Sequence, residues 1–133
     1  MPGIDECLLQ AMVVPGARGA AIVDWTSGLA LGSIGETPGG DHEATAAETA
    51  ELARMAAEYP TFAPEGETAP DGAKGLPVED LIVTTRTGYH VVRFVETTFD
   101  SSVFLHIWLD RETGNLALAR LRLADLAERL VLG

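Results

Sequence analysis

Three strand-like runs in the second half of the chain, followed directly by a helical pattern, constrain the fold more than any other feature. The runs are rich in Val, Ile, Phe, Thr and Tyr, and they cover Leu81–Thr85, Tyr89–Thr97 and Val103–Leu109. Short turns containing Gly, Asp and Ser separate them, which predicts an antiparallel meander. From Asn115 to Leu130 the apolar spacing changes to the period of a helix, so a helix is expected to close the sequence.

The first half of the chain predicts a helix, a hairpin and a second helix. A short amphipathic helix is expected over Asp5–Met12, and a longer one over about His42–Tyr59 with Asp41 as its N-terminal cap. Between them, Gly19–Val23 and Leu29–Ile34 have the composition of two strands joined by a turn. The predicted order is therefore helix, two strands, helix, three strands, helix.

Both sides of the Val103–Leu109 strand are apolar, which places it near the middle of a sheet covered by helices on both faces. The chain has 133 residues, of which 47% are hydrophobic, and this suits a single α+β domain over residues 1–133. The Pro- and Gly-rich stretch at about 60–77 has almost nothing to bury. It is expected to be a disordered insertion rather than a binding flap.

The net charge of −11 lies entirely in the first part of the chain. Residues 1–80 contain fourteen Asp and Glu against three Lys and Arg, whereas residues 81–133 contain six of each kind. Such an acidic half repels nucleic acid and anionic membranes and attracts basic protein surfaces. The simpler interpretation, that the acidity only keeps a small protein in solution, stays open.

Other features indicate the compartment. No apolar run is long enough to span a membrane, and the N-terminus lacks the pattern of a secretion signal. The single cysteine, Cys7, excludes an internal disulfide framework and fits a reducing compartment. A cytoplasmic protein without direct membrane insertion is expected.

The helix over His42–Tyr59 carries two apolar stripes. The larger one is expected to cover the sheet, and it consists of Leu52, Met55, Ala56 and Tyr59. The second contains only alanines, and it consists of Ala46, Ala50, Ala53 and Ala57. Small side chains let two helices approach closely, so this stripe is a candidate contact with a second subunit. The alternative is that the alanines only favour helix formation and face water.

No catalytic, cofactor or metal-binding pattern is present. The chain has no phosphate-binding loop, no nucleophile elbow and no paired His or Cys motif. His42, His90 and His106 are isolated in sequence, but the last two lie in neighbouring predicted strands and could face one another. Histidines packed or hydrogen-bonded within the sheet are expected rather than a metal site. Cys7 is expected to be a small core residue. We therefore predict no enzyme activity and no cofactor.

Two segments resemble those of a known family. The opening of the last helix, Asn115-Leu116-Ala117-Leu118-Ala119-Arg120-Leu121, and more weakly the hairpin from Ile22-Val23-Asp24 to Gly28-Leu29, are similar to the roadblock / dynein light chain domain family, in its bacterial, small-GTPase-associated form. The resemblance implies five antiparallel strands between one central helix and two terminal helices, in a profilin-like or longin-like layout. It also implies a non-catalytic homodimer that binds and regulates Ras-like GTPases or serves as a scaffold. The chain departs from the family pattern in its 60–77 insertion and its acidic central helix.

The resemblance suggests two sets of site residues. The dimer would form through the alanine stripe and through edge-to-edge pairing of the strand that contains Leu81, Ile82, Val83 and Thr84. The partner would meet acidic residues of the central helix, namely Glu43, Glu48, Glu51 and Glu58. The alternative function is a small-molecule-sensing or scaffold module of a signalling complex, for which a hollow lined by Trp25, Phe94 and Trp108 would be evidence.

Overall fold

The computed structural model describes residues 3–63, 77–96 and 102–130. Within these ranges the chain forms the predicted order of helices and strands, and each element begins and ends within two residues of its expected bounds. The elements are α1 (Ile4–Ala11), β1 (Ala17–Asp24), β2 (Leu29–Gly35), α2 (His42–Glu58), β3 (Asp80–Thr84), β4 (Gly88–Val95), β5 (Val103–Asp110) and α3 (Leu116–Arg129). Most of the predicted insertion, residues 64–76, lies outside the described part of the chain.

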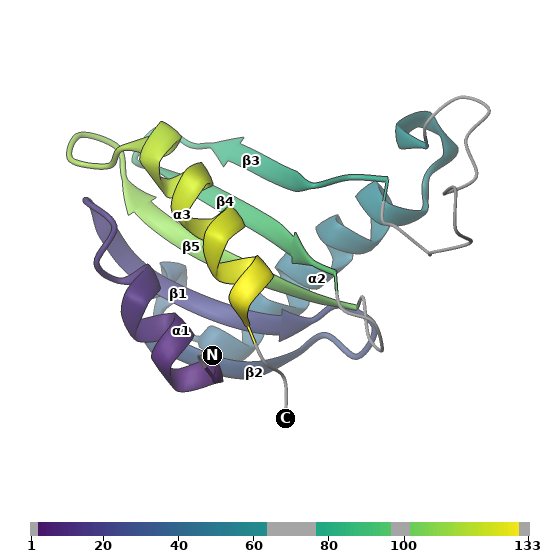
Figure 1. The fold of residues 1–133 in the computed structure, drawn as a ribbon, viewed down its shortest axis with the longest axis horizontal. Helices are drawn as coiled ribbons and strands as arrows, with labels where there is room; N and C mark the ends of the chain where they lie inside the picture. Colours follow the sequence, from purple (N-terminus) through teal and green to yellow (C-terminus); the bar gives the residue numbers. More distant parts are fainter. Residues whose placement is uncertain (1–2, 64–76, 97–101, 131–133) are drawn as a thin grey trace.

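The strands form one antiparallel sheet in the order β2-β1-β5-β4-β3. The prediction that β5 occupies the middle of the sheet is confirmed, and seven of its eight residues are buried. In Figure 1, α1 and α3 lie across one face of the sheet and α2 lies behind the other. The predicted architecture, an α+β sheet with helices on both faces, is thus confirmed.

Each face of the sheet has its own hydrophobic core. On one face, alternate strand residues such as Val91, Leu105 and Ile107 pack with Leu8 of α1 and Leu123 of α3. On the other face, aromatic and β-branched residues pack beneath α2, and these are Val23, Trp25, Val92, Phe94 and Phe104. The period of two residues along a strand sends neighbouring side chains to opposite cores.

Side-chain caps fix where two helices begin. The Asp41 carboxylate accepts hydrogen bonds from the backbone N–H groups of Glu43 at 3.0 Å and Ala44 at 3.3 Å, as its position before α2 predicts. The Asn115 side-chain oxygen accepts one from the N–H of Leu118 at 3.0 Å. These bonds satisfy backbone donors that a helix leaves without partners, so α2 and α3 start at defined residues.

The two outer strands of the sheet differ in regularity. β3 pairs with β4 without interruption from Asp80 to Thr84. β2 pairs with β1 through a bulge. Ile22 lies opposite Gly32 and Val23 lies opposite Ala30, so Leu31 has no partner residue on β1. The sheet therefore has one regular outer edge and one bulged outer edge.

Candidate interaction surfaces

The alanine stripe of α2 faces the sheet of its own subunit. Ala46, Ala50 and Ala53 are buried, with Ala50 only 1% exposed, and Ala57 packs partly against the same core. The prediction that this stripe contacts a second subunit is therefore wrong, and so is the alternative that it faces water. Small side chains fit here because Trp25, Phe94 and other large residues already fill the space between helix and sheet.

The larger apolar residues of α2 lie on its outer surface. Leu52 is 36% exposed, Met55 44% and Tyr59 54%, although each was expected to cover the sheet. Only Ala56 of the predicted covering stripe is buried. This exposure matters for function, because exposed apolar side chains at helical spacing on a small protein indicate a surface that a partner can cover.

A groove of about 320 Å³ separates this apolar side of α2 from β3. It is lined by Pro38, Thr45, Glu48, Thr49, Leu52, Val83, Thr85, His90 and Val92. On β3, Ile82, Val83 and Thr84 are exposed, whereas Leu81 packs partly against the core beneath α2. The strand residues predicted for a dimer contact thus border the groove and the outer edge of the sheet, apart from Leu81, which is half-buried.

A histidine pair lies beside this groove, and one of its members, His90, lines it. His90 Nδ1 and His106 Nε2 are 2.8 Å apart, which confirms that the two residues face one another. The His90 ring also stacks on Trp108 at 6.0 Å between centroids, and the Arg18 guanidinium lies 3.8 Å from the centre of the Trp108 ring.

Burial lowers the pKa of His90. Burial, and then repulsion from charged His90 and His42, lowers the pKa of His106 to about 3. At neutral pH the pair is therefore uncharged, with one ring donating its hydrogen bond to the other.

The opposite side of α2, toward β2, is acidic. Glu43, Glu51 and Glu58 are exposed and fall on one helical stripe with Ala47 and Arg54, since the five residues are spaced by three or four positions. The stripe faces β2, because Ala47 lies against Gly28, and Arg54 donates to the backbone oxygen of Trp25 at 3.2 Å.

The four glutamates predicted to bind a partner do not share one surface. Three of them lie on the β2 side of α2, whereas Glu48 lines the groove toward β3. Glu43 lines a second groove of about 320 Å³ between α2 and β2, together with Gly28, Leu29, Ala30, Gly32, Ser33 and His42. The periodicity of the sequence could have separated Glu48 from the other three, but it does not show which stripe faces which strand.

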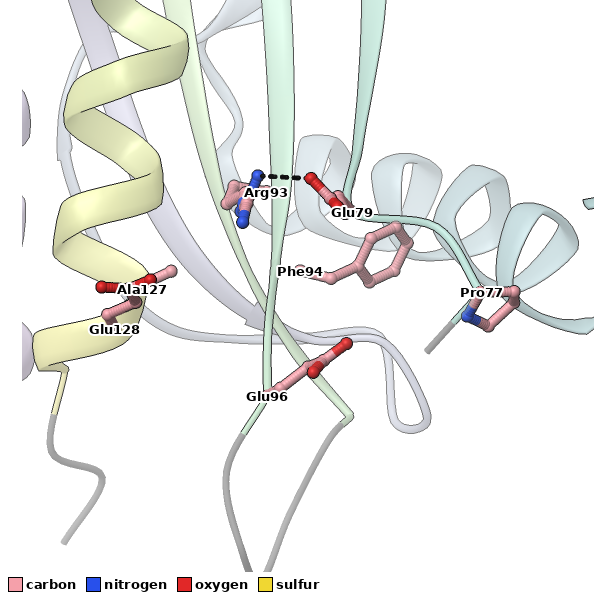
Figure 2. Close-up of a pocket in the computed structure, with 7 residues that line it drawn as sticks. All are labelled: Pro77, Glu79, Arg93, Phe94, Glu96, Ala127 and Glu128. Atoms are coloured by element: carbon pink, nitrogen blue, oxygen red, sulfur yellow. Dashed lines mark ion pairs between the residues drawn. The ribbon is translucent and has the colours of Figure 1, made fainter. Parts of the chain in front are cut away.

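A third pocket, of about 380 Å³, lies at the end of α3. Figure 2 shows it bordered by Pro77, Glu79, Arg93, Phe94, Glu96, Ala127 and Glu128. The Arg93 guanidinium is 3.6 Å from the Glu79 carboxylate, a loose ion pair of partly solvated side chains. Of the residues singled out from the sequence, only Phe94 borders this pocket, because the pocket is assembled from three segments that are distant in sequence.

The other predicted candidates are dispersed. Trp25 and Phe94 pack in the core beneath α2, whereas Trp108 stacks on His90, so in the described residues the three do not surround a common hollow.

Cys7 is fully buried, as expected, and burial raises the pKa of its thiol. No group of three or more His, Cys, Asp or Glu side chains in the described ranges is placed to hold a metal ion. The helices found there are too short or too polar to cross a bilayer.

The sequence matches no protein-family model and no curated protein. Solved structures, in contrast, share its architecture. A Roadblock/LC7 domain from Streptomyces avermitilis has a TM-score of 0.69 and 19% sequence identity, over 96% of this chain and 94% of that one. MglB from Myxococcus xanthus has a TM-score of 0.67 and 21% identity, over 94% of this chain and 79% of that one. The gliding protein MglB from Thermus thermophilus has a TM-score of 0.69 and 17% identity, over 94% and 83%. The chain therefore has the fold of the Roadblock/LC7 domain.

Proposed function

We propose that this protein is a non-catalytic, homodimeric adaptor or regulator of a Ras-like small GTPase. The fold and the resemblance of the α3 opening to roadblock domains support the class of function. A further solved structure with this fold, at 17% identity and a TM-score of 0.69, is of MglB in a tetrameric arrangement, so self-association occurs in that protein. The observation that carries the proposal is that the exposed apolar residues of α2 and the regular outer strand β3 border the same groove.

The β3 edge is suited to pair with its own copy. Its register with β4 is uninterrupted, and Ile82 and Val83 are each 38% exposed. An outer strand presents unpaired backbone N–H and C=O groups, and antiparallel pairing about a twofold axis satisfies them on both copies. The two sheets would then join into one continuous sheet.

The apolar side of α2 extends the same contact. Leu52, Met55 and Tyr59 recur at helical spacing, and Leu52 also lines the groove beside Val83. These larger residues take the role first predicted for the alanine stripe. Covering them removes exposed apolar area from water, which is the main favourable contribution at the centre of a dimer interface. Glu48 would lie at or near this contact.

The acidic side of α2 is left for the partner. Glu43, Glu51 and Glu58 lie on the stripe of α2 that faces β2, beside the proposed dimer contact, so two copies would present two acidic stripes. Such stripes accelerate encounter with a basic patch, and the gain falls as salt screens it.

The test uses a Ras-like GTPase from the same genome, loaded with GDP or with a non-hydrolysable GTP analogue. Surface plasmon resonance should show binding that differs between the two nucleotide states. Val83→Asp should dissociate the dimer into monomers. Thr87→Asp, in the exposed β3–β4 turn, is its matched control. Absence of binding in both states contradicts the GTPase assignment, and GTP hydrolysis by the purified protein alone contradicts the non-catalytic one.

A further inference from the structure

We propose that the groove between β2 and the acidic side of α2 docks a short segment of a second protein, one that carries an apolar anchor residue flanked by Lys or Arg. The proposal deepens the proposed function and rests on it for one point, that the acidic side of α2 meets a partner. The groove is then the place where the partner is held, and the basic, apolar-centred segment is the part of the partner that binds.

The groove supplies an apolar seat. Leu29 is 65% exposed and forms one wall with Ala30, while Gly28 and Gly32 add only backbone to the lining. The His42 ring is held 3.0 Å from the Gly35 carbonyl oxygen, so the start of α2 is fixed against the end of β2. A cavity of about 320 Å³ with this lining accommodates one or two aliphatic side chains rather than a large ligand.

The charge around the groove is negative. Glu43 forms its wall, and within the described residues no ion pair engages Glu43, Glu51 or Glu58. Arg18 is paired with Glu36 at 3.3 Å, and Arg54 is the one positive charge on the stripe, so the three glutamates outnumber it. Basic residues beside the apolar anchor would therefore gain favourable interactions that a neutral segment lacks. A second copy of this acidic surface, or an anionic membrane, would be repelled.

The bulge at Leu31 determines how such a segment binds. Strand addition needs a regular row of backbone groups, and β2 is interrupted where Leu31 has no partner residue on β1. We therefore place the binding energy in a side-chain anchor and flanking charges instead of in a long ladder of backbone hydrogen bonds. β3, which has no such bulge, is the edge suited to strand pairing.

The test measures fluorescence anisotropy of a short labelled peptide with a Leu-Ile centre and Arg on either side. Two control peptides replace the Leu-Ile centre with Ser or the Arg residues with Glu. The protein variants are Glu43→Lys, Leu29→Ser and Ser33→Trp, the last of which fills the groove without changing charge. Matched controls are Glu112→Lys in the β5–α3 turn and Leu121→Ser on α3, both at exposed positions away from the groove.

Each groove variant should weaken peptide binding about tenfold or more, and each control variant by less than about twofold. Both control peptides should bind at least about tenfold more weakly than the parent peptide. The proposal is overturned if Glu112→Lys weakens binding as much as Glu43→Lys, because the attraction is then only general charge. It is also overturned if the Ser-centred peptide binds as tightly as the parent, or if Ser33→Trp has no effect.

The same variants separate this proposal from the proposed function. Peptide binding that is lost in the groove variants, alongside a GTPase that does not bind, supports the groove and contradicts the GTPase assignment. GTPase binding that survives in all three groove variants, with no peptide binding, supports the assignment and contradicts the groove. Circular dichroism of each variant excludes unfolding as the cause of any loss.

Discussion

The two long sides of α2 differ in almost every property that decides what a surface contacts. Toward β3 the helix exposes Leu52, Met55 and Tyr59 beside a regular strand edge. Toward β2 it exposes Glu43, Glu51 and Glu58 beside a bulged edge. One helix can therefore serve both proposed contacts, self-association toward β3 and partner binding toward β2, because three of its four exposed glutamates lie on the β2 side.

The largest expected effect comes from the buried side of α2. Ala50→Arg forces a charge into the core between α2 and the sheet, and we expect it to lower the free energy of unfolding by on the order of 4 kcal/mol. Ala47→Arg, three residues earlier at an exposed position, should change stability by less than about 0.5 kcal/mol. Urea unfolding measures both. A stable Ala50→Arg protein that is merely monomeric would show that this side faces a second subunit after all.

Acid should destabilise the fold through the histidine pair. The pKa of His106 is about 3 in the folded protein and 6.5 as the ordinary value, so between these pH values the unfolded chain binds the proton and the folded one does not. Stability from this residue is full above pH 6.5 and falls as the pH drops toward 3, by a total on the order of 5 kcal/mol. The pH dependence of urea midpoints should show this slope in the native protein and lose it in His106→Gln. An identical slope in the native protein and in His106→Gln would show that other residues cause the acid sensitivity.

The apolar side of α2 should control assembly. Met55→Arg places a charge in the proposed dimer contact, and we expect the dimer dissociation constant to rise about 100-fold, equivalent to roughly 3 kcal/mol. Ala47→Arg, at an exposed position on the β2 side of the helix, is the control. Sedimentation equilibrium would measure both constants. Equal dissociation constants for Met55→Arg and the unmodified protein would remove this side of α2 from the interface.

The acidic side should control partner association and leave the dimer intact. Reversing two charges in Glu51→Lys/Glu58→Lys should slow association with the GTPase by about tenfold at low salt, with a smaller effect at high salt. Stopped-flow fluorescence at several salt concentrations measures these rates. An association rate indifferent to both salt and charge reversal would leave the acidic stripe without a role in encounter.

Sequence reasoning recovered most of the fold because local signals dominate it. The turn before β4, the Asp41 cap, the apolar composition of β5 and the position of His90 beside His106 all follow from residues close in the chain or from strand alternation. The period of α2 likewise revealed its stripes. These features depend on residues that are close in the chain, so they can be predicted without knowledge of the tertiary contacts.

The orientation of α2 could not be derived in the same way. Periodicity shows that Ala50 and Leu52 lie on different stripes, but not which stripe meets the sheet. That choice depends on Trp25, Phe94 and Phe104, whose volume beneath the helix leaves room only for alanine. The grooves and the pocket of Figure 2 join segments that are distant in sequence, so no local pattern marks them.

Disulfide trapping tests the difference between the two edges most directly. Cys7 is fully buried, so a cysteine introduced on either outer strand is the accessible thiol among the described residues. Single replacements at Leu81, Ile82, Val83 and Thr84 of β3 would be compared with replacements at Leu29 and Leu31 of β2 under mild oxidation. A symmetric pair of β3 strands brings at least one of its positions within disulfide distance of its own copy. We expect rapid covalent dimers from β3 cysteines and few from β2 cysteines. Cross-linking of β2 cysteines without cross-linking of β3 cysteines would contradict the proposed dimer interface.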